Sequence, residues 1–182
     1  MSFTPERYQI NNLNFIPFIS KNEVDNAILE ISKQINFDYK NSTPVFLITL
    51  KGAVFFAVKL LENINLNCEI HVISAKSYGS QLESSGDVMI KAEELNLQNR
   101  DVIIIEDIID TGYTMEKVLS VIQKTSPRSV AIASLLAKPE KACVDIKIDY
   151  LGFNIPAQFV IGSGLDFDEK GRNLSGIYIL EE

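Results

Sequence analysis

Three carboxylates stand close together in the chain, directly after a short apolar run. Glu106 and Asp107 follow the run at residues 102–105, and Asp110 comes three residues later. Clustered carboxylates repel one another unless a cation or the hydroxyl groups of a ligand share their charge. The segment therefore predicts a site for a metal-bound or polyhydroxylated ligand.

A turn rich in hydroxyl groups continues this segment. Thr111, Gly112 and Thr114 precede apolar residues at helical spacing, so the turn is expected to open a helix over residues 115–122. Gly112 can adopt positive φ, and backbone N–H groups at a helix start bind anions, which together predict a phosphate site. The segment contains neither the P-loop pattern nor the G-x-G-x-x-G fingerprint. For each residue alone a plainer interpretation stays open, in which the acids cap the helix and Gly112 makes a turn.

The elements that position this segment predict an α/β fold. The β-branched run 102–105 lacks polar alternation, as expected for a strand of a parallel sheet that is covered on both faces. Ligands of such sheets bind beyond the carboxyl ends of the strands, where the acids stand. Similar patterns predict strands at 45–50, 68–75 and 130–136, a helix at 53–61, and a helix after the capping box at 20–23. Short apolar runs at 148–153, 159–161 and 177–180 are too interrupted for further α/β units and are expected to form a ligand-binding wall.

Length and composition bound the class of protein. The 182 residues fit one domain, residues 1–182, with a single sizeable core. A net charge of −7 and a pI near 4.8 disfavour binding to nucleic acid or to an anionic membrane. Cys68 and Cys143 lie far apart and one histidine is present, so neither a disulfide framework nor a zinc site is expected. Residues 1–7 carry no apolar signal core and no apolar run approaches the roughly 20 residues of a membrane span, which predicts a cytoplasmic protein.

The acidic segment also resembles a known family. Residues 106–114, from Glu106-Asp107 through Asp110-Thr111-Gly112 to Thr114, are similar to the phosphoribosyl-diphosphate signature of type I phosphoribosyltransferases, in the hypoxanthine-guanine branch. The resemblance extends over residues 50–52, 76–80, 159–160 and 165–166 and is weakest at the amino terminus. It implies the type I phosphoribosyltransferase fold: a mainly parallel sheet flanked by helices, with a small hood formed by about residues 1–19 and 150–182. Such enzymes are expected to be homodimers or homotetramers.

The resemblance implies purine salvage with magnesium as cofactor. The 5-phosphoribosyl group would pass from phosphoribosyl diphosphate to hypoxanthine, and also to guanine, giving IMP or GMP and diphosphate. Glu106 and Asp107 would hold the ribose hydroxyls directly or through magnesium, and Asp166 would help bind a second magnesium. Asp110 would handle the proton at the purine N7, as the catalytic residue.

The remaining substrate contacts also follow from the resemblance. The turn Leu50-Lys51-Gly52 would clamp the pyrophosphate, with a Leu50–Lys51 peptide that can be cis. The 5′-phosphate would be held by Thr111, Gly112, Tyr113 and Thr114, with Ile108 in the same segment. A lid carrying Ser77 and Tyr78 would close over the sugar and exclude water. The base and the departing diphosphate would be contacted by Lys138 at the 6-oxo group, Phe159 by stacking, Val160 through its backbone, and Arg172.

Departures from the family pattern and rival functions bear on these expectations. The family often has aromatic residues where Ser163 and Gly171 stand and proline where Ser175 stands, which affects the base wall and the diphosphate exit. One rival is a regulator of the same fold that binds nucleic acid, although the acidic balance argues against it. Another is a xanthine or adenine phosphoribosyltransferase. Lys138 favours 6-oxopurines, but the residues that would choose among hypoxanthine, guanine and xanthine are not identified by the sequence.

Overall fold

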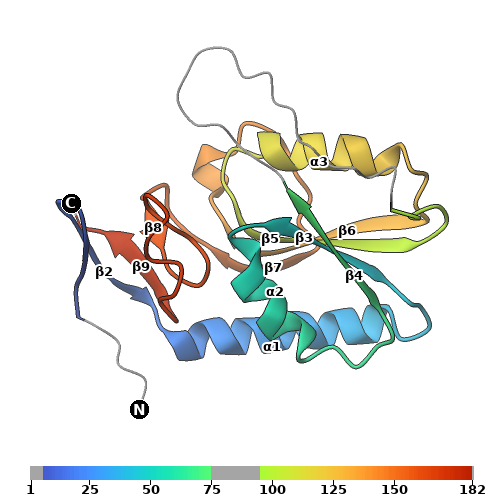
Figure 1. Cartoon of the computed structure of the whole chain (residues 1–182), viewed down its shortest axis with the longest axis horizontal. Coiled ribbons are helices and arrows are strands. Elements are labelled where there is room, and N and C mark those ends of the chain that lie inside the picture. Colours follow the sequence, from blue (N-terminus) through green and yellow to red (C-terminus); the bar gives the residue numbers. More distant parts are fainter. Residues whose placement is uncertain (1–5, 75–94, 182) are drawn as a thin grey trace.

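A five-stranded parallel sheet forms the centre of the computed structural model, which describes residues 6–74 and 95–181 (Figure 1). The strand order is β4-β3-β5-β6-β7, and every neighbouring pair is parallel. The strands are β3 (Val45–Leu50), β4 (Glu69–Ser74), β5 (Asp101–Ile109), β6 (Ser129–Ala137) and β7 (Tyr150–Asn154). The α/β expectation is therefore confirmed.

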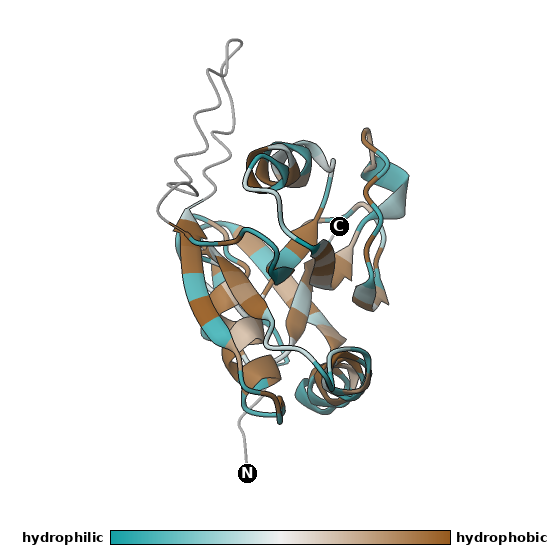
Figure 2. Ribbon diagram, turned by 90° about the vertical axis from the view of Figure 1, so that its right-hand side faces the viewer, coloured by the Kyte–Doolittle hydropathy of each residue, from teal (hydrophilic) through white to brown (hydrophobic). Residues whose placement is uncertain are grey.

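Helices cover both faces of this sheet, which explains the uninterrupted apolar run. In Figure 1, α3 (Tyr113–Gln123) lies on one face, and α1 (Lys21–Asp38) and α2 (Ala53–Leu61) lie on the other. Ile103 and Ile105 of β5 pack in the cluster with α1 and α2, whereas Val102 and Ile104 pack in the cluster with α3. Successive side chains of a strand point to opposite faces, and both faces are covered here, so every position of the run 102–105 is apolar. Hydrophobic residues accordingly dominate the central strands (Figure 2).

Two of the helices begin where the sequence indicated, whereas α3 begins at Tyr113, two residues before the expected start at 115. Ser20 caps α1 and the Glu23 carboxylate accepts the Ser20 backbone N–H, which completes the predicted capping box. The predicted helix at 53–61 has the observed bounds of α2. None of the helices in the described part of the chain is long and apolar enough to cross a bilayer.

A small antiparallel sheet forms the hood at one end of the molecule (Figure 1). Its order is β1-β2-β9-β8, so amino-terminal and carboxyl-terminal segments lie side by side. The strands are β1 (Tyr8–Ile10), β2 (Leu13–Ile19), β8 (Val160–Ile161) and β9 (Ile177–Leu180). A separate cluster of buried side chains, which includes Phe15 and Tyr178, fills the hood.

Two expectations about strand limits need correction. The hood was expected to take in residues from about 150, but β7 pairs with β6 from Tyr150 to Asn154 and belongs to the parallel sheet. Tyr150 is buried there and its hydroxyl donates a 2.8 Å hydrogen bond to Asp38 at the end of α1. The sequence predicts that the acids follow the end of the strand at 105, but β5 continues through Glu106 and Asp107 to Ile109, because its ladder with β6 reaches Ile109↔Ala137.

An ion pair between the buried Asp101 and the exposed Arg128 ties β5 to its surroundings at the edge away from the acidic segment. Asp101 accepts hydrogen bonds from Ser129 Oγ at 2.7 Å and Arg128 Nε at 2.8 Å, and also from Ser42. The Arg128 hydrogen bond, aided by Ser42 and Ser129, holds the pKa of Asp101 well below its usual range. The ionised carboxylate is therefore a stabilising partner in the folded state.

Asp101→Asn is expected to lower the free energy of unfolding at pH 7 by about 2 kcal/mol, because hydrogen bonds to a charged group are lost. The pKa of Asp101 is lowered on folding, so its stabilisation is fully present above the unfolded-state pKa of about 3.9 and is lost progressively as the pH falls from there through the lower pKa of the folded state. Urea unfolding at pH 7 and at pH 3 measures both effects. If Asp101→Asn lowered the free energy of unfolding equally at the two pH values, this account would be contradicted. The control Asp145→Asn, at an exposed position, should leave the free energy of unfolding unchanged at both pH values.

Candidate active site

A cavity of about 910 Å³ opens at the carboxyl edge of the parallel sheet, facing the hood. That volume suits a small-molecule ligand. Most side chains expected to bind substrate line it: Leu50, Lys51, Gly52, Glu106, Asp107, Ile108, Asp110, Thr111, Gly112, Thr114, Lys138, Phe159, Val160, Asp166 and Arg172. Tyr113 does not line it, because its side chain points to solvent and is 52% exposed. Ser77 and Tyr78 lie outside the described residues, so the expected lid has no structural description.

Two neighbouring carboxylates of β5 occupy the floor of the cavity. The Asp107 backbone N–H donates to Glu106 Oε1 at 3.2 Å. Burial and the hydrogen-bonded, negatively charged Asp107 raise the pKa of Glu106 well above its usual range. Within the described chain no lysine or arginine pairs with either acid, so the pair carries charge that a ligand can relieve.

The turn at Gly52 packs against this acidic pair. A Cβ added to Gly52 would lie 1.7 Å from Asp107 Oδ2, and a Cβ added to Gly164 would lie 2.0 Å from the Gly52 carbonyl oxygen. Gly52 is thus held between an acid of β5 and a loop of the hood. The Leu50–Lys51 peptide directly before it is cis.

Gly52→Ala is expected to destabilise the fold by about 1–3 kcal/mol, because the new methyl group overpacks the Asp107 carboxylate. The backbone of Gly52 has φ −63° and ψ −43°, which alanine adopts readily, so the contact alone causes the loss. Denaturant unfolding of Gly52→Ala, Asp107→Ala and the double variant measures the coupling. The double variant should recover most of the loss caused by Gly52→Ala, and strictly additive losses would contradict the contact.

The turn into α3 presents unoccupied backbone donors. Gly112 has φ 90°, and a Cβ there would meet the Val144 carbonyl oxygen at 3.0 Å, so glycine is required on two counts. The N–H groups of Cys143 and Val144 both donate to the Thr111 carbonyl, at 2.9 and 3.1 Å, which fixes the turn. No side chain caps α3, so N–H groups of its first turn are available to an anion.

Asp110 lies between two lysines at the opposite side of this turn. Its Oδ2 is 2.8 Å from Lys141 Nζ and 3.6 Å from Lys138 Nζ, whereas its Oδ1 is buried with no hydrogen-bond partner in the described chain. Lys138 is 5% exposed, and this burial lowers its pKa, opposed by the Asp110 charge and reinforced by Lys141. A carboxylate with an unused oxygen can accept a proton, and a buried ammonium can donate to a ligand oxygen.

The hood contributes an aromatic wall. Phe159 precedes β8 and packs edge-on against Phe167, with ring centroids 5.6 Å apart and an interplanar angle of 86°. The ring centroid of the buried Phe15 lies 6.4 Å from that of Phe159, and neither Phe15 nor Phe167 lines the cavity itself. Phe159 remains 43% exposed and lines the cavity, so part of its ring is available for stacking on a flat ligand.

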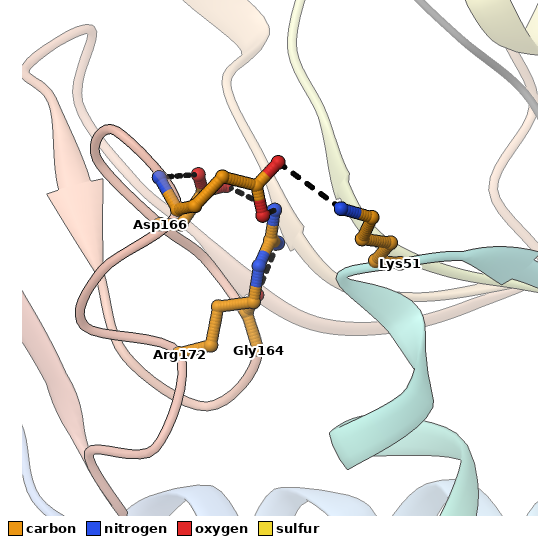
Figure 3. A network of polar contacts seen from close by, with 5 residues as sticks. Lys51, Gly164, Asp166 and Arg172 are labelled. Carbon is orange, nitrogen blue, oxygen red and sulfur yellow. Dashed lines mark hydrogen bonds and ion pairs between the residues drawn. The ribbon is translucent and has the colours of Figure 1, made fainter.

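A network of charged side chains joins the hood to the Lys51 turn (Figure 3). Arg172 donates to the Gly164 carbonyl at 2.8 Å and contacts Asp166 Oδ1 at 2.8 Å. Asp166 Oδ2 accepts the Glu169 backbone N–H at 2.9 Å, so both of its oxygens have partners. Among the described residues no three histidine, cysteine or acidic side chains lie close enough to hold a metal, so Asp166 is not brought together with Glu106 and Asp107.

Several cavity residues were not anticipated from the sequence. Thr49 donates to the Ile105 carbonyl at 2.8 Å and is 2% exposed, and it also lies beside Glu106. Lys141 and Glu169 each follow an expected site residue by three positions, and this spacing was the available signal. The complete unanticipated set is Thr49, Ile109, Met115, Lys141, Ala157, Leu165 and Glu169.

Comparisons of the whole chain with known proteins find similarity to hypoxanthine-guanine phosphoribosyltransferases. The phosphoribosyl transferase domain model matches residues 20–168. The hypoxanthine-guanine phosphoribosyltransferase of Streptococcus thermophilus is 40% identical over 164 residues, covering 90% of this chain and 91% of that protein, and the Bacillus subtilis protein of the same name is 36% identical over the same shares. A hypoxanthine phosphoribosyltransferase structure from Staphylococcus aureus gives a TM-score of 0.84 at 34% identity, covering 91% of this chain and 90% of that one. A Bacillus anthracis hypoxanthine-guanine phosphoribosyltransferase structure gives 0.79 at 32% identity, covering 91% and 96%.

Proposed function

The chain belongs to the phosphoribosyltransferase family, and we propose that it transfers the 5-phosphoribosyl group from phosphoribosyl diphosphate to hypoxanthine, and to guanine, in purine salvage. The products are IMP or GMP and diphosphate. One observation carries the proposal: paired acids, an uncapped helix start and a buried lysine beside Asp110 line a single cavity. Each of these features is suited to bind a different group of the two substrates.

Binding follows from the charges and donors around the cavity. Glu106 and Asp107 accept hydrogen bonds from the ribose hydroxyls, and the first turn of α3 receives the 5′-phosphate. The purine stacks on Phe159, and Lys138 donates to its 6-oxo group. In the proposed binding mode the sugar lies between the base and the cationic side chains Lys51 and Arg172, which receive the departing diphosphate; both cations line the cavity.

Catalysis depends on where charge develops. Positive charge grows on the sugar as the diphosphate leaves, and the carboxylates below the sugar stabilise it. Asp110 accepts the proton from the purine N7 through its unpartnered Oδ1, while Lys141 holds Oδ2.

The donor set of the floor fits magnesium. Magnesium in proteins binds one or two carboxylates together with substrate oxygens, and Glu106 and Asp107 supply two carboxylates without a cationic side chain beside them. When bound with the diphosphate, magnesium would neutralise part of its charge. A second ion at Asp166 would require that carboxylate to exchange its contact with Arg172 or with the Glu169 backbone.

Location and assembly are also part of the proposal. The free cysteines Cys68 and Cys143 support a reducing, cytoplasmic setting. Phe55 and Val58 of α2 are 40% and 52% exposed, which supports a homodimer or homotetramer. Sedimentation of the purified chain measures the assembly.

A panel of bases tests the function. Hypoxanthine, guanine, xanthine, adenine and uracil are each incubated with phosphoribosyl diphosphate, with and without magnesium, and the nucleotide product is measured. Turnover of hypoxanthine and guanine that requires magnesium is expected. Preference for xanthine would move the chain to the xanthine branch, and no turnover of any base would reject the enzyme assignment.

A further inference from the structure

One carboxylate bridges the two cations that face the diphosphate end of the cavity. Glu169 Oε1 is 3.2 Å from Lys51 Nζ, and Glu169 Oε2 is 3.3 Å from Arg172 Nη2. Lys51 precedes α2, whereas Glu169 and Arg172 lie between β8 and β9 of the hood, so the bridge joins two sides of the cavity that all three residues line. Figure 3 shows Lys51 and Arg172 at the two ends of this network. The two carboxylate oxygens, one at each cation, are anionic acceptors of the same kind as the oxygens of a diphosphate.

The backbone beneath Glu169 is fixed independently of its side chain. The Glu169 N–H donates to Asp166 Oδ2 at 2.9 Å, and the turn is closed by mutual backbone hydrogen bonds of 3.0 Å between Phe167 and Lys170. Asp168 and Glu169 occupy the two central positions of this turn with φ 52° and 60°. The Glu169 side chain is 65% exposed, so its carboxylate can leave the bridge while the turn stays in place.

The two cations differ in the contacts that they make with groups other than Glu169. Arg172 has two further contacts besides Glu169, with the Gly164 carbonyl and with Asp166. Lys51 is 70% exposed, and Glu169 is the ion-pair partner the described structure gives it. The lysine ammonium therefore depends on Glu169 for its position across the mouth, and the nearby Lys51 and Arg172 also lower the pKa of Glu169, which keeps it ionised.

We propose that Glu169 is a positioning residue for the diphosphate end of the site: its carboxylate holds Lys51 beside Arg172 in the free enzyme and is displaced by the diphosphate group. The inference rests on the proposed function. Because the carboxylate and the diphosphate compete for the same two cations, Glu169 weakens diphosphate binding. Release of product diphosphate is favoured as a consequence.

Titration with inorganic diphosphate tests the exchange. Glu169→Gln keeps the size of the side chain and removes its charge, so it should bind diphosphate about three- to tenfold more tightly than wild type, the range expected when exposed ion pairs are lost. Asp168→Asn is the matched control: it removes one carboxylate from the adjacent position of the same turn, where Asp168 faces Lys170 at 3.5 Å. Calorimetry at a fixed magnesium concentration measures the three affinities, and diphosphate inhibition of turnover should strengthen by the same factor in Glu169→Gln.

The outcomes separate this inference from the function on which it rests. Tighter binding in Glu169→Gln, with Asp168→Asn within twofold of wild type, supports the exchange. Equal tightening in both variants would show a general charge effect and overturn it, and weaker binding in Glu169→Gln would overturn it as well. Wild-type turnover of hypoxanthine, measured in parallel, reports on the proposed function alone.

Discussion

Asp110→Asn is expected to lower kcat for hypoxanthine by about 10²- to 10⁴-fold, the usual contribution of a positioned general base, with little change in KM. The structure supplies the reason: Asp110 Oδ1 is buried without a partner, while Oδ2 is held by Lys141 at 2.8 Å. Asparagine preserves the size of the side chain and removes the proton acceptor. Steady-state rates with saturating phosphoribosyl diphosphate measure the loss.

The control is Asp145→Asn, which makes the same chemical change at an exposed position outside the cavity. It should retain wild-type rates. A kcat for Asp110→Asn equal to that of wild type would remove Asp110 from proton transfer. A rise in KM at unchanged kcat would assign it to binding alone.

Lys138→Gln is expected to narrow the preference for hypoxanthine over adenine, which in the wild-type enzyme should approach roughly 10⁴-fold. The Lys138 side chain is 5% exposed, and its 3.6 Å separation from Asp110 Oδ2 is longer than an ordinary hydrogen bond. Its ammonium is therefore available to the 6-oxo oxygen of hypoxanthine, whereas the amino group of adenine would face it donor to donor. Glutamine offers both a carbonyl and an amide, so it accommodates either base.

The ratio of kcat/KM for the two bases decides this prediction, even if both absolute values fall. Lys141→Gln serves as the control, because Lys141 contacts the same Asp110 oxygen from a half-exposed position. It should leave the ratio of the two bases near that of wild type. If Lys138→Gln also keeps the wild-type ratio, another residue recognises the 6-position.

The elements of the α/β part could be predicted because local signals and tertiary packing agree there. Residues 102–105 are apolar at every position. In the structure the odd-numbered and even-numbered side chains of that run pack against helices on opposite faces of the sheet. The capping box at Ser20 fixes the start of α1 through contacts three residues apart. Such short-range patterns do not depend on how the rest of the chain folds.

The limits of β5 and β7 could not be predicted, because pairing between distant strands sets them. Glutamate has a low propensity for β-strands, yet the backbone of Glu106 pairs with Ser134 of β6. Tyr150 joins the parallel sheet by pairing with Ala133 of β6, and its hydroxyl donates a hydrogen bond to Asp38, far away in sequence. The roles of Lys141 and Glu169 likewise arise from contacts across 31 and 118 residues, which no local pattern records.

The continuation of β5 through the acids has a consequence for the entropy of ligand binding. Fixing the backbone of one residue costs about 1–2 kcal/mol in conformational entropy, and in this chain the sheet incurs that cost for Glu106 and Asp107 during folding. Binding of a ligand to these two residues therefore costs little further conformational entropy of their backbone. If the acids lay on a flexible loop, ordering that loop would reduce the affinity for the ligand. Because they lie on a central strand, this cost is absent and more of the binding free energy is available for holding the reacting sugar.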